Sequence, residues 1–374
     1  MKIYYLANAR IPTEKAHGFQ IMKMCEGFAN QGVNVELIIP QRYNYIKDDP
    51  FKFYGIRNNF KIKKISCLDL VKFGRFGFIL QTLTFLFFVK IYSLFRFKKY
   101  DIIYTREHFS RLFFKNLIFE DHEPRGLQWM YKFFLRKIRK KVIVAPSLEK
   151  LYAKFNINEK SYFIAPNGVD LDEFKRVEKD KNIWKQDFGF SVNDKVVLYV
   201  GHFYQWKGVY TFLDSAKFLG KNDIKLVLIG GTKIDQKNVC DYIEKEKISN
   251  VYVKNFILHK EVIKYIKSAD ILVLPNTAKE ERSSKYTTPI KLFEYMASEV
   301  PIIASELDSF YRYLKNEKNT LFFQPDSARD LAKKTMRLIN NKQLGQNIAK
   351  NALECAQEYT WEKRAKEIIN FINK

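Results

Sequence analysis

The sequence predicts an α/β fold with two domains, each built around a parallel sheet. Three observations lead to this prediction. The chain has 374 residues, and a single hydrophobic core stops growing at about 250–300 residues. Short apolar runs alternate with amphipathic segments in both halves, which is typical of strands connected by helices. Polar residues and glycines follow several of these runs, and parallel α/β sheets bind ligands at that end of their strands.

In the first half, the alternation begins at the N-terminus. A helix is predicted over residues 17–32, because apolar side chains recur at helical spacing and Gly32 closes the segment. A Pro-Asn-Gly turn within "YFIAPNGVDLDEF" closes this half, and the charged stretch 175–195 is the predicted connection between domains. The predicted strands are residues 2–7, 33–40, 100–105, 117–122 and 142–147.

The second half repeats the pattern. Its predicted strands are residues 196–201, 224–230, 250–256, 270–275, 300–305 and 319–324. Its predicted helices include residues 208–220, 261–269, 327–341 and 344–374. Two such domains of similar size are expected to bind a ligand in the cleft between them.

Composition narrows the class of protein. Hydrophobic residues make up 47% of the chain, which permits packed cores and argues against disorder. The four cysteines are scattered, which favours a reducing cytosol over a disulfide framework or a zinc site. The net charge of +24 suits nucleic acid, an anionic membrane or a phosphate-bearing substrate. Solvated lysines of a Lys-rich proteome are the alternative explanation.

Two basic-aromatic segments lie in the first half. Residues 76–99 are the most apolar region, but their uncharged core is shorter than the about 20 residues that span a bilayer. A buried helix and an interfacial helix both fit this segment. Residues 129–141, "WMYKFFLRKIRKK", have helical apolar spacing with cations between. Together the two segments favour contact with a membrane surface, and no spanning segment is predicted.

A glycine-bounded loop follows the predicted strand 196–201. Gly201 and Gly208 flank this loop, which carries His202 and Lys207 and leads into a helix. Backbone N–H groups at a helix start and a lysine together can bind an anion. The alternative is an ordinary glycine turn, as also expected for "IGG", which contains Gly230.

The stretch "SSKYTTPIKLFEYMASEVPIIAS" raises a sharper possibility. Lys291 and Glu294 are three residues apart on a helix that starts near Pro289, directly after another strand. A surface ion pair would stabilise the helix by only a few tenths of a kcal/mol. Alternatively, Lys291 neutralises a phosphate and Glu294 accepts hydrogen bonds from the hydroxyl groups of a ribose. A nucleotide presents both groups side by side.

Candidate groups also follow strands of the first half. His17 and Gly18 start the first helix, Arg106 ends another predicted strand, and Glu120 and His122 lie in "FEDHEP". His122 is suited to relay a proton or to position a hydroxyl. A hydrogen-bonded structural histidine is the alternative. The five histidines show no metal-ligand spacing.

Together these pieces resemble the retaining glycosyltransferases of family 4, which have the GT-B fold. The resemblance covers nearly the whole chain and depends on the order and spacing of its motifs. The motifs are "AHGFQIMKMCEGFANQG", "FEDHEP", "APNGVDLDEF", "VGHFYQWKG", "IGG", "SADILVLPN", the stretch 283–305 and "YTWEKRAKEI". It implies two Rossmann-like domains whose parallel sheets face each other across a cleft. The implied parts are an acceptor-binding domain (1–177), a nucleotide-sugar-binding domain (185–355) and a C-terminal helix (356–374) that returns to the N-terminal domain.

The resemblance also implies roles for individual residues. The family carries two glutamates separated by seven residues: the second matches Glu294, which would bind the donor ribose, and Tyr286 replaces the first. The family's phosphate-binding Arg and Lys fall on His202 and Lys207, so only the lysine is kept. The implied catalytic residues are His122, Lys207 and Glu294. The implied donor-binding residues are Gly18, Gly201, His202, Lys207, Gly230, Tyr286, Thr288, Pro289, Ile290, Lys291 and Glu294. The implied acceptor-side residues are His17, Arg106, Glu120 and His122.

The implied reaction transfers a sugar, with retention of configuration, from a UDP- or GDP-sugar to a hydroxyl acceptor. We expect a saccharide or lipid-linked acceptor used for a cell-surface polymer, and no metal or other cofactor, because protein cations stabilise the diphosphate. The expected location is the cytoplasm, peripherally on the inner face of the plasma membrane, where an anionic surface is a partner and nucleic acid is not. A sugar-nucleotide epimerase of the same fold and a catalytically weak nucleotide-sugar-binding relative remain open.

Overall fold

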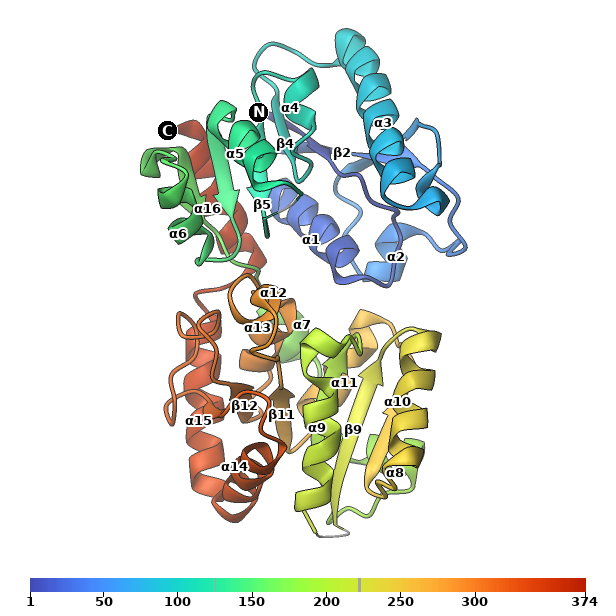
Figure 1. The fold of residues 1–374 in the computed structure, drawn as a ribbon, viewed down its shortest axis with the longest axis vertical. Helices are drawn as coiled ribbons and strands as arrows, with labels where there is room; N and C mark the ends of the chain where they lie inside the picture. The colour runs from blue at the N-terminus through green and yellow to red at the C-terminus, as the bar shows by residue number, and fades with distance from the viewer. Residues whose placement is uncertain (125, 221–222) are drawn as a thin grey trace. The chain divides into compact units, whose positions relative to one another are not determined.

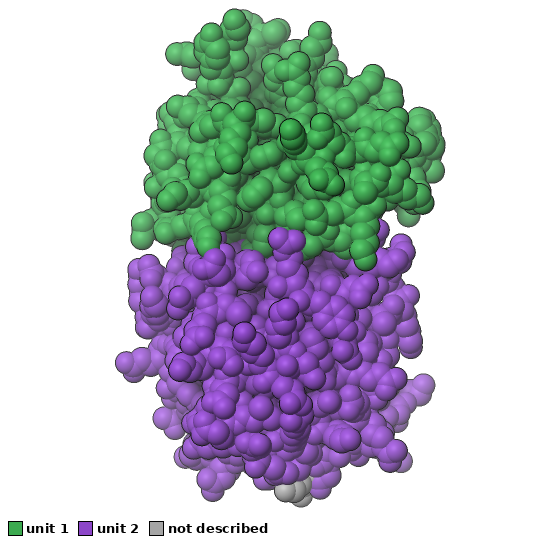
Figure 2. Space-filling model, turned by 90° about the vertical axis from the view of Figure 1, so that its left-hand side faces the viewer, with its two compact units in different colours: residues 1–167, 361–374 green, residues 168–360 purple. Residues whose placement is uncertain are grey.

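A computed structural model describes residues 1–124, 126–220 and 223–374. The chain forms two compact units, which Figure 2 shows in different colours. The first unit comprises Met1–Asn167 and Trp361–Lys374, and the second comprises Gly168–Thr360. The chain therefore leaves the first unit after Asn167, earlier than the predicted boundary at residue 177, and re-enters it at Trp361 rather than at residue 356.

The first unit contains a seven-stranded parallel sheet with the order β3-β2-β1-β4-β5-β6-β7. Its strands are β1 (Lys2–Leu6), β2 (Asn34–Gln41), β3 (Lys61–Ser66), β4 (Ile102–Thr105), β5 (Ile118–Asp121), β6 (Lys140–Ile143) and β7 (Tyr162–Ile164). The inner strands are almost wholly buried, as expected when helices cover both faces of a parallel sheet. β3, "KIKKIS", was not predicted, because its lysines hide the apolar alternation; it is an edge strand, where lysine is common.

The helices of this unit (Figure 1) are α1 (Ala16–Asn30), α2 (Pro50–Tyr54), α3 (Gly74–Arg96), α4 (Ser110–Phe113), α5 (Gln128–Lys137), α6 (Leu148–Lys154) and α16 (Trp361–Asn373). Short 3₁₀ segments, η1 (Val71–Phe73) and η2 (Glu159–Ser161), precede α3 and β7. α16 packs against α1, where the side of Gly27 meets Ala365 and Trp361. The C-terminal helix therefore belongs to the core of the N-terminal unit.

Among the described residues, one helical segment, Val71–Arg96, is long and apolar enough to cross a membrane by length and composition alone. The sequence predicted no spanning segment, because Lys90 ends the uncharged run. The helix continues through Lys90 for further turns, so its length exceeds that of the uncharged run. Only 33% of its most apolar window is buried.

The second unit contains a six-stranded parallel sheet with the order β10-β9-β8-β11-β12-β13. Its strands are β8 (Lys195–Gly201), β9 (Ile224–Gly230), β10 (Val251–Lys254), β11 (Ile271–Leu274), β12 (Ile302–Ser305) and β13 (Leu321–Phe323). Its helices are α7 (Leu171–Arg176), α8 (Asn182–Phe188), α9 (Val209–Ser215), α10 (Lys233–Lys245), α11 (His259–Ser268), α12 (Glu281–Ser284), α13 (Ile290–Met296), α14 (Ala328–Asn340) and α15 (Lys342–Ala356). Two 3₁₀ segments, η3 (Gln205–Lys207) and η4 (Ala216–Phe218), flank α9.

Two sequence expectations change here. The stretch 175–195 was predicted to be a connection, but it contains α8, whose Ile183 and Trp184 are buried in the second core. The Trp184 indole N–H donates to the Ser268 carbonyl at 2.9 Å, so these two apolar residues fix the stretch to the sheet layer. The predicted helix 344–374 is two helices, α15 and α16, because the chain passes from one unit to the other between them.

Candidate active site

The loops after β8 and β11 are in direct contact. The strand order of the second sheet reverses between these two strands, and such a switch point is where parallel sheets bind ligands. Gly208 has φ +70°, and a Cβ atom at this position would overlap the carbonyl of Pro275. The N–H of Thr277 donates to the Trp206 carbonyl at 3.4 Å. Glycine at position 208 is therefore required both by backbone conformation and by close approach.

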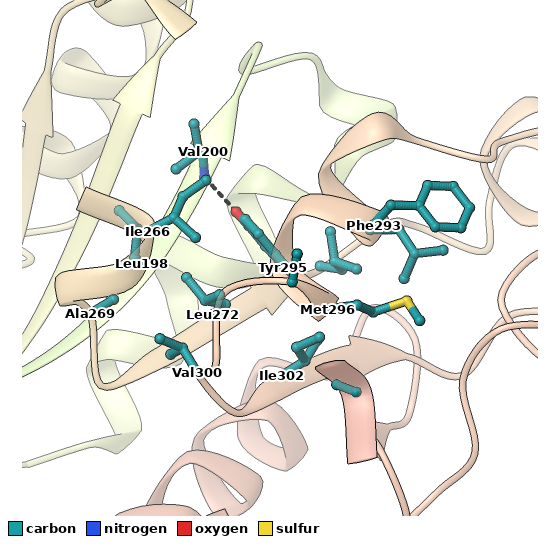
Figure 3. Close-up of a cluster of buried hydrophobic side chains, with 14 of the residues drawn as sticks. Leu198, Val200, Ile266, Ala269, Leu272, Phe293, Tyr295, Met296, Val300 and Ile302 are labelled. Carbon is teal, nitrogen blue, oxygen red and sulfur yellow. Dashed lines mark hydrogen bonds between the residues drawn. The ribbon is translucent and has the colours of Figure 1, made fainter. Parts of the chain in front are cut away.

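Helix α13 is held against the end of β8. Its apolar face packs into the cluster in Figure 3, where Phe293, Tyr295 and Met296 lie among side chains from β8, β11 and β12. The Tyr295 hydroxyl accepts a hydrogen bond from the backbone N–H of Val200 at 2.9 Å, which is the dashed line in Figure 3. This packing fixes the position of Glu294, the neighbour of Tyr295, at the carboxyl end of the sheet.

Glu294 is a buried carboxylate with two cationic or polar partners. Only 2% of the residue is exposed. Lys291 Nζ lies 2.8 Å from one carboxylate oxygen, and His259 Nε2 lies 2.6 Å from the other. Burial alone would raise the pKa of Glu294, but Lys291 and His259 lower it to about 2. The pair is therefore not the surface ion pair considered as the alternative, and Glu294 remains an ionised acceptor at neutral pH.

Lys207 lies in a cluster of positive charge. Burial, together with the nearby cations Arg282 and Lys291, lowers the pKa of Lys207 to about 7. Lys207 Nζ is 4.2 Å from the centre of the Trp206 ring, and the Arg282 guanidinium is 4.9 Å from that centre. An anion bound next to Lys207 would relieve the repulsion among these three cations and favour the charged form of the lysine.

The other predicted donor-binding residues of this unit surround the same strand ends. His202 stacks on Tyr204 with ring centres 5.0 Å apart, and its carbonyl accepts a hydrogen bond from the Tyr199 hydroxyl. Gly201 and Gly230 have positive φ, and a Cβ atom on Gly230 would overlap the Gly201 backbone, so their immediate role is clearance between the adjacent ends of β8 and β9. The segment from α12 to α13 carries the rest: Tyr286, half-buried; Thr288, buried; Pro289; and Ile290, the first residue of α13.

In the first unit, Glu120 and His122 form a second buried arrangement at the end of β5. His122 Nε2 lies 2.7 Å from one oxygen of Glu120, and the Arg364 guanidinium of α16 lies 3.0 Å from the other. The Tyr104 hydroxyl donates to the same carboxylate, and Arg106 Nε lies 3.8 Å from it. Burial alone would raise the pKa of Glu120, but Arg364, His122 and Arg106 hold it well below its usual value.

Glu120 was predicted as an acceptor-side residue, and the geometry gives it a different position. It is 1% exposed and both of its oxygens are occupied, so it orients His122 rather than facing a ligand itself. His122 keeps a partly exposed side chain. A carboxylate bonded to one ring nitrogen fixes the orientation of an imidazole, as required of a proton-relay group.

His17 and Gly18 lie in the first turn of α1. A Cβ atom on Gly18 would overlap the Tyr54 hydroxyl and the Thr13 methyl group. The Tyr54 hydroxyl also accepts a hydrogen bond from the backbone N–H of Thr13 and donates one to the Thr13 carbonyl. Packing against Tyr54 therefore explains this glycine without a ligand, and its implied role in donor binding stays a prediction.

The predicted site residues thus form two groups, one at the strand ends of each sheet. Sequence reasoning missed His259, Arg282 and Arg364. His259 follows the predicted strand 250–256, and the strand-end rule that selected His122 would also have selected it. Arg282 lies in the charged stretch "AKEERSSK", which gave no signal apart from charge. Within residues 1–124, 126–220 and 223–374, no group of three or more His, Cys, Asp or Glu side chains is arranged to hold a metal ion.

Comparison with known sequences finds a family model that matches most of the second unit. Residues 180–354 match the sequence model of the family described as "Glycosyl transferases group 1". An uncharacterised glycosyltransferase of Methanocaldococcus jannaschii is 27% identical over 166 residues, which are 44% of each chain. A Campylobacter jejuni N,N'-diacetylbacillosaminyl-diphospho-undecaprenol α-1,3-N-acetylgalactosaminyltransferase is 25% identical over 236 residues, 62% of this chain and 59% of the relative. The chain thus spans about half the length of the curated relatives it matches.

Comparison with solved structures extends over the whole chain. Sucrose-phosphate synthase from Thermosynechococcus elongatus is similar with a TM-score of 0.78 and 17% identity, covering 100% of this chain and 98% of that structure. Anabaena HepE in complex with UDP-glucose is similar with a TM-score of 0.78 and 14% identity, covering 100% and 99%. At these identities the likeness concerns the fold alone. It confirms the predicted GT-B class, with which the two parallel sheets agree.

Proposed function

Because the second unit carries a glycosyl transferases group 1 domain, we propose that the protein is a retaining glycosyltransferase. It would transfer a sugar from a nucleoside diphosphate sugar to a hydroxyl group of an acceptor. One observation supports this proposal most directly: a buried, ionised Glu294 lies beside Lys291 at the carboxyl end of a parallel sheet, and Lys207 carries a pKa lowered by burial and by nearby cations.

The nucleotide would occupy the second unit. Glu294 has two oxygens, each with two lone pairs, so it can accept hydrogen bonds from ribose hydroxyl groups while Lys291 and His259 remain bound. The diphosphate would lie against Lys207, Lys291 and Arg282. His202 stands at the position of the family's phosphate-binding arginine. Arg282 would supply the missing guanidinium from another part of the chain.

The chemical step would depend mainly on charge stabilisation. Cleavage of the bond between the anomeric carbon and the phosphate oxygen places negative charge on the leaving diphosphate and positive charge on the sugar ring. The clustered cations Lys207, Lys291 and Arg282 would stabilise this charge separation, and such electrostatic stabilisation is usually the largest contribution to catalysis. The acceptor hydroxyl would attack from the face that the diphosphate leaves and would give its proton to the departing phosphate oxygen, so configuration is retained.

The acceptor would belong to the first unit, with His122, Arg106 and His17 as candidate contacts. The Campylobacter relative is named for a lipid-linked diphosphate acceptor, and HepE was solved with UDP-glucose. We therefore propose a UDP-sugar or GDP-sugar donor and a lipid-linked saccharide acceptor for a cell-surface polymer. The enzyme would work in the cytoplasm, on the inner face of the plasma membrane.

A thermal-shift screen over UDP, GDP and their sugars tests the donor, with Glu294→Gln as the diagnostic variant. Loss of the charged acceptor is expected to weaken donor binding by about 10–100-fold. Glu281→Gln is the matched control. Glu281 lies in the neighbouring helix α12 and forms an exposed ion pair with Lys285, the residue directly after that helix. Equal donor affinity in both variants would exclude the ribose assignment.

Labelled donor sugars and a lipid extract then separate the alternatives. Transfer of label to lipid supports the proposal. Release of an epimerised sugar nucleotide supports the epimerase instead, and donor binding without turnover supports a catalytically weak relative. This last control is necessary because Tyr286 and His202 stand where the family has a glutamate and an arginine.

A further inference from the structure

We propose that the outer side of α3, with the neighbouring α4 and α5, docks on an anionic lipid bilayer, and that α3 lies flat in its interface. We name this surface the aromatic face; its members are Phe76, Ile79, Phe87, Ile91, Leu94 and Phe95 of α3, Leu112 of α4, and Trp129 and Phe133 of α5. The inference rests on the proposed function for its biological purpose, and on the first unit alone for its geometry.

α3 is apolar on two opposite sides. One side packs into the first unit through Phe85, Leu86 and Val89, which are fully buried. The other side repeats apolar residues at helical spacing but is exposed: Phe76 is 72% and Phe95 is 81% accessible. A helix that is apolar all round is normally buried in a protein core or in a membrane. Nothing in the described parts of the chain covers the outer side, which suggests that lipid does.

Polar contacts hold the inner side of α3 to the rest of the unit. Asn8 donates to the Thr82 hydroxyl at 2.7 Å, and the Tyr92 hydroxyl donates to Glu36 at 2.7 Å. A helix that crossed the bilayer would lose these bonds and bring unpaired polar groups into hydrocarbon. We therefore infer that α3 lies on the membrane with its inner side still packed on the protein.

The aromatic face continues from α3 onto its neighbours. α3 contacts α4, and Phe97, directly after α3, stacks on Phe114, directly after α4. α4 in turn is fixed to α5, because the Arg111 side chain donates to the Lys137 carbonyl at 3.0 Å. Right-handed crossovers place the helices that follow β3, β4 and β5 on the same side of the sheet. Trp129, exposed at the start of α5, is a residue type enriched at membrane interfaces.

Charge selects an anionic bilayer as the partner. Residues 71–100 contain no Asp or Glu and carry Lys72, Arg75, Lys90, Arg96, Lys98 and Lys99. Most of these cations lie near the two ends of α3, where they can reach headgroups while the aromatic side chains enter the acyl boundary. A second copy of the chain is a poorer partner, because an isologous dimer through this face would bring two sets of cations together.

Sedimentation with vesicles tests the inference. The full chain is expected to bind vesicles of phosphatidylcholine mixed with phosphatidylglycerol more strongly than phosphatidylcholine alone, and high salt should weaken the binding. Phe76→Ser and Phe95→Ser should each weaken binding by about tenfold. The triple variant Lys72→Gln, Lys98→Gln, Lys99→Gln should weaken it by about 100-fold, at about fivefold per cation.

The matched control is Ile234→Ser with Lys237→Gln, which removes an exposed apolar residue and a cation from α10 of the second unit. Vesicle binding that falls equally in the control, or that does not respond to the α3 variants, would overturn the inference. A dimer that the Phe76 variant abolishes would show that a second copy covers this face instead. Nucleotide binding by the same variants is measured in parallel: its absence in the wild type refutes the proposed function and leaves the vesicle result to stand by itself.

Discussion

Lys207 is a cation that burial makes easy to deprotonate. Its pKa of about 7 means that the lysine is charged below that pH and increasingly neutral above it. A diphosphate needs the charged form, and the phosphates of a nucleotide sugar do not titrate between pH 7 and 9. We therefore expect donor affinity to fall as pH rises, approaching tenfold per unit well above the pKa. Calorimetric titration of the donor at several pH values measures this slope.

Lys207→Arg provides the control for this pH dependence. A guanidinium stays protonated across the same range, so the variant should bind donor with an affinity that changes little with pH. A wild-type affinity that is equally flat would show that Lys207 does not contact the diphosphate. Uptake of a proton on binding, detected in buffers of different ionisation enthalpy, would independently support its contact with the diphosphate.

Residue pairs differ in how far a sequence can predict them. Lys291 and Glu294 are predictable because three residues on a helix place both side chains on one face. Their burial is not predictable locally, because it depends on Tyr295 bonding to the end of β8. His259 reaches Glu294 across 35 positions of sequence, and such a contact requires the fold to be known first.

At the scale of elements, the loop between β8 and α9 depends on glycine more than other turns do. Gly208→Ala would place a methyl group into the Pro275 carbonyl in addition to the cost of positive φ. We expect a loss of about 3 kcal/mol or more in unfolding free energy. Gly32→Ala has a similar φ, +77°, but open space around it, so about 1–2 kcal/mol is expected there. Urea denaturation of both variants measures the difference, and equal losses would contradict the proposed close contact.

Helix α16 contributes a buried cation to a sheet formed by the other end of the chain. Arg364→Met would leave the buried Glu120 with the Tyr104 hydroxyl, His122 and the more distant Arg106 as its partners. Removing one partner of a buried ion pair typically costs about 3–5 kcal/mol, so the variant should unfold at a markedly lower urea concentration. Arg337→Ala removes a comparable pair with Glu317 on the surface, and its expected cost is about 0–1 kcal/mol. Similar losses in both variants would contradict a special role for Arg364.

Elements with a single clear pattern are predictable, and those with mixed patterns are not. The central strands β1, β8 and β11 are short apolar runs with polar ends, and all three were predicted near their observed bounds. β3 was missed because half of its residues are lysines, and α8 was missed because charged residues surround Ile183 and Trp184. In both cases tertiary packing overrides a polar local sequence.

At the scale of the whole molecule, the two units have closely related sheet topologies but different chain continuity. Both sheets are parallel, and in each the strand order reverses beside the first strand of the unit, between β1 and β4 and between β8 and β11. Alternation of strands and helices in each half was enough to predict this class. The predicted Pro-Asn-Gly turn contains the first passage between units, at Asn167, whereas the return after Thr360 was not predictable, because it lies inside the segment 344–374 that reads as one helix. The second unit is one continuous segment, whereas the first needs residues from both ends of the chain.

This difference predicts what removal of residues 361–374 does. The truncated chain loses the packing of Trp361 and Ala365 on α1 and the Arg364–Glu120 ion pair, all within the first unit. The second unit keeps every strand of its sheet. We therefore expect the first unit to lose most of its stability, while the second unit still unfolds cooperatively and still binds the nucleoside diphosphate.

Hydrogen–deuterium exchange should show faster exchange in β1 and β5 and unchanged protection in β8 and β9. Removal of only Asn373 and Lys374, which are exposed, is the control and should leave both units protected. Faster exchange spread equally over both sheets would show that the two units do not fold independently.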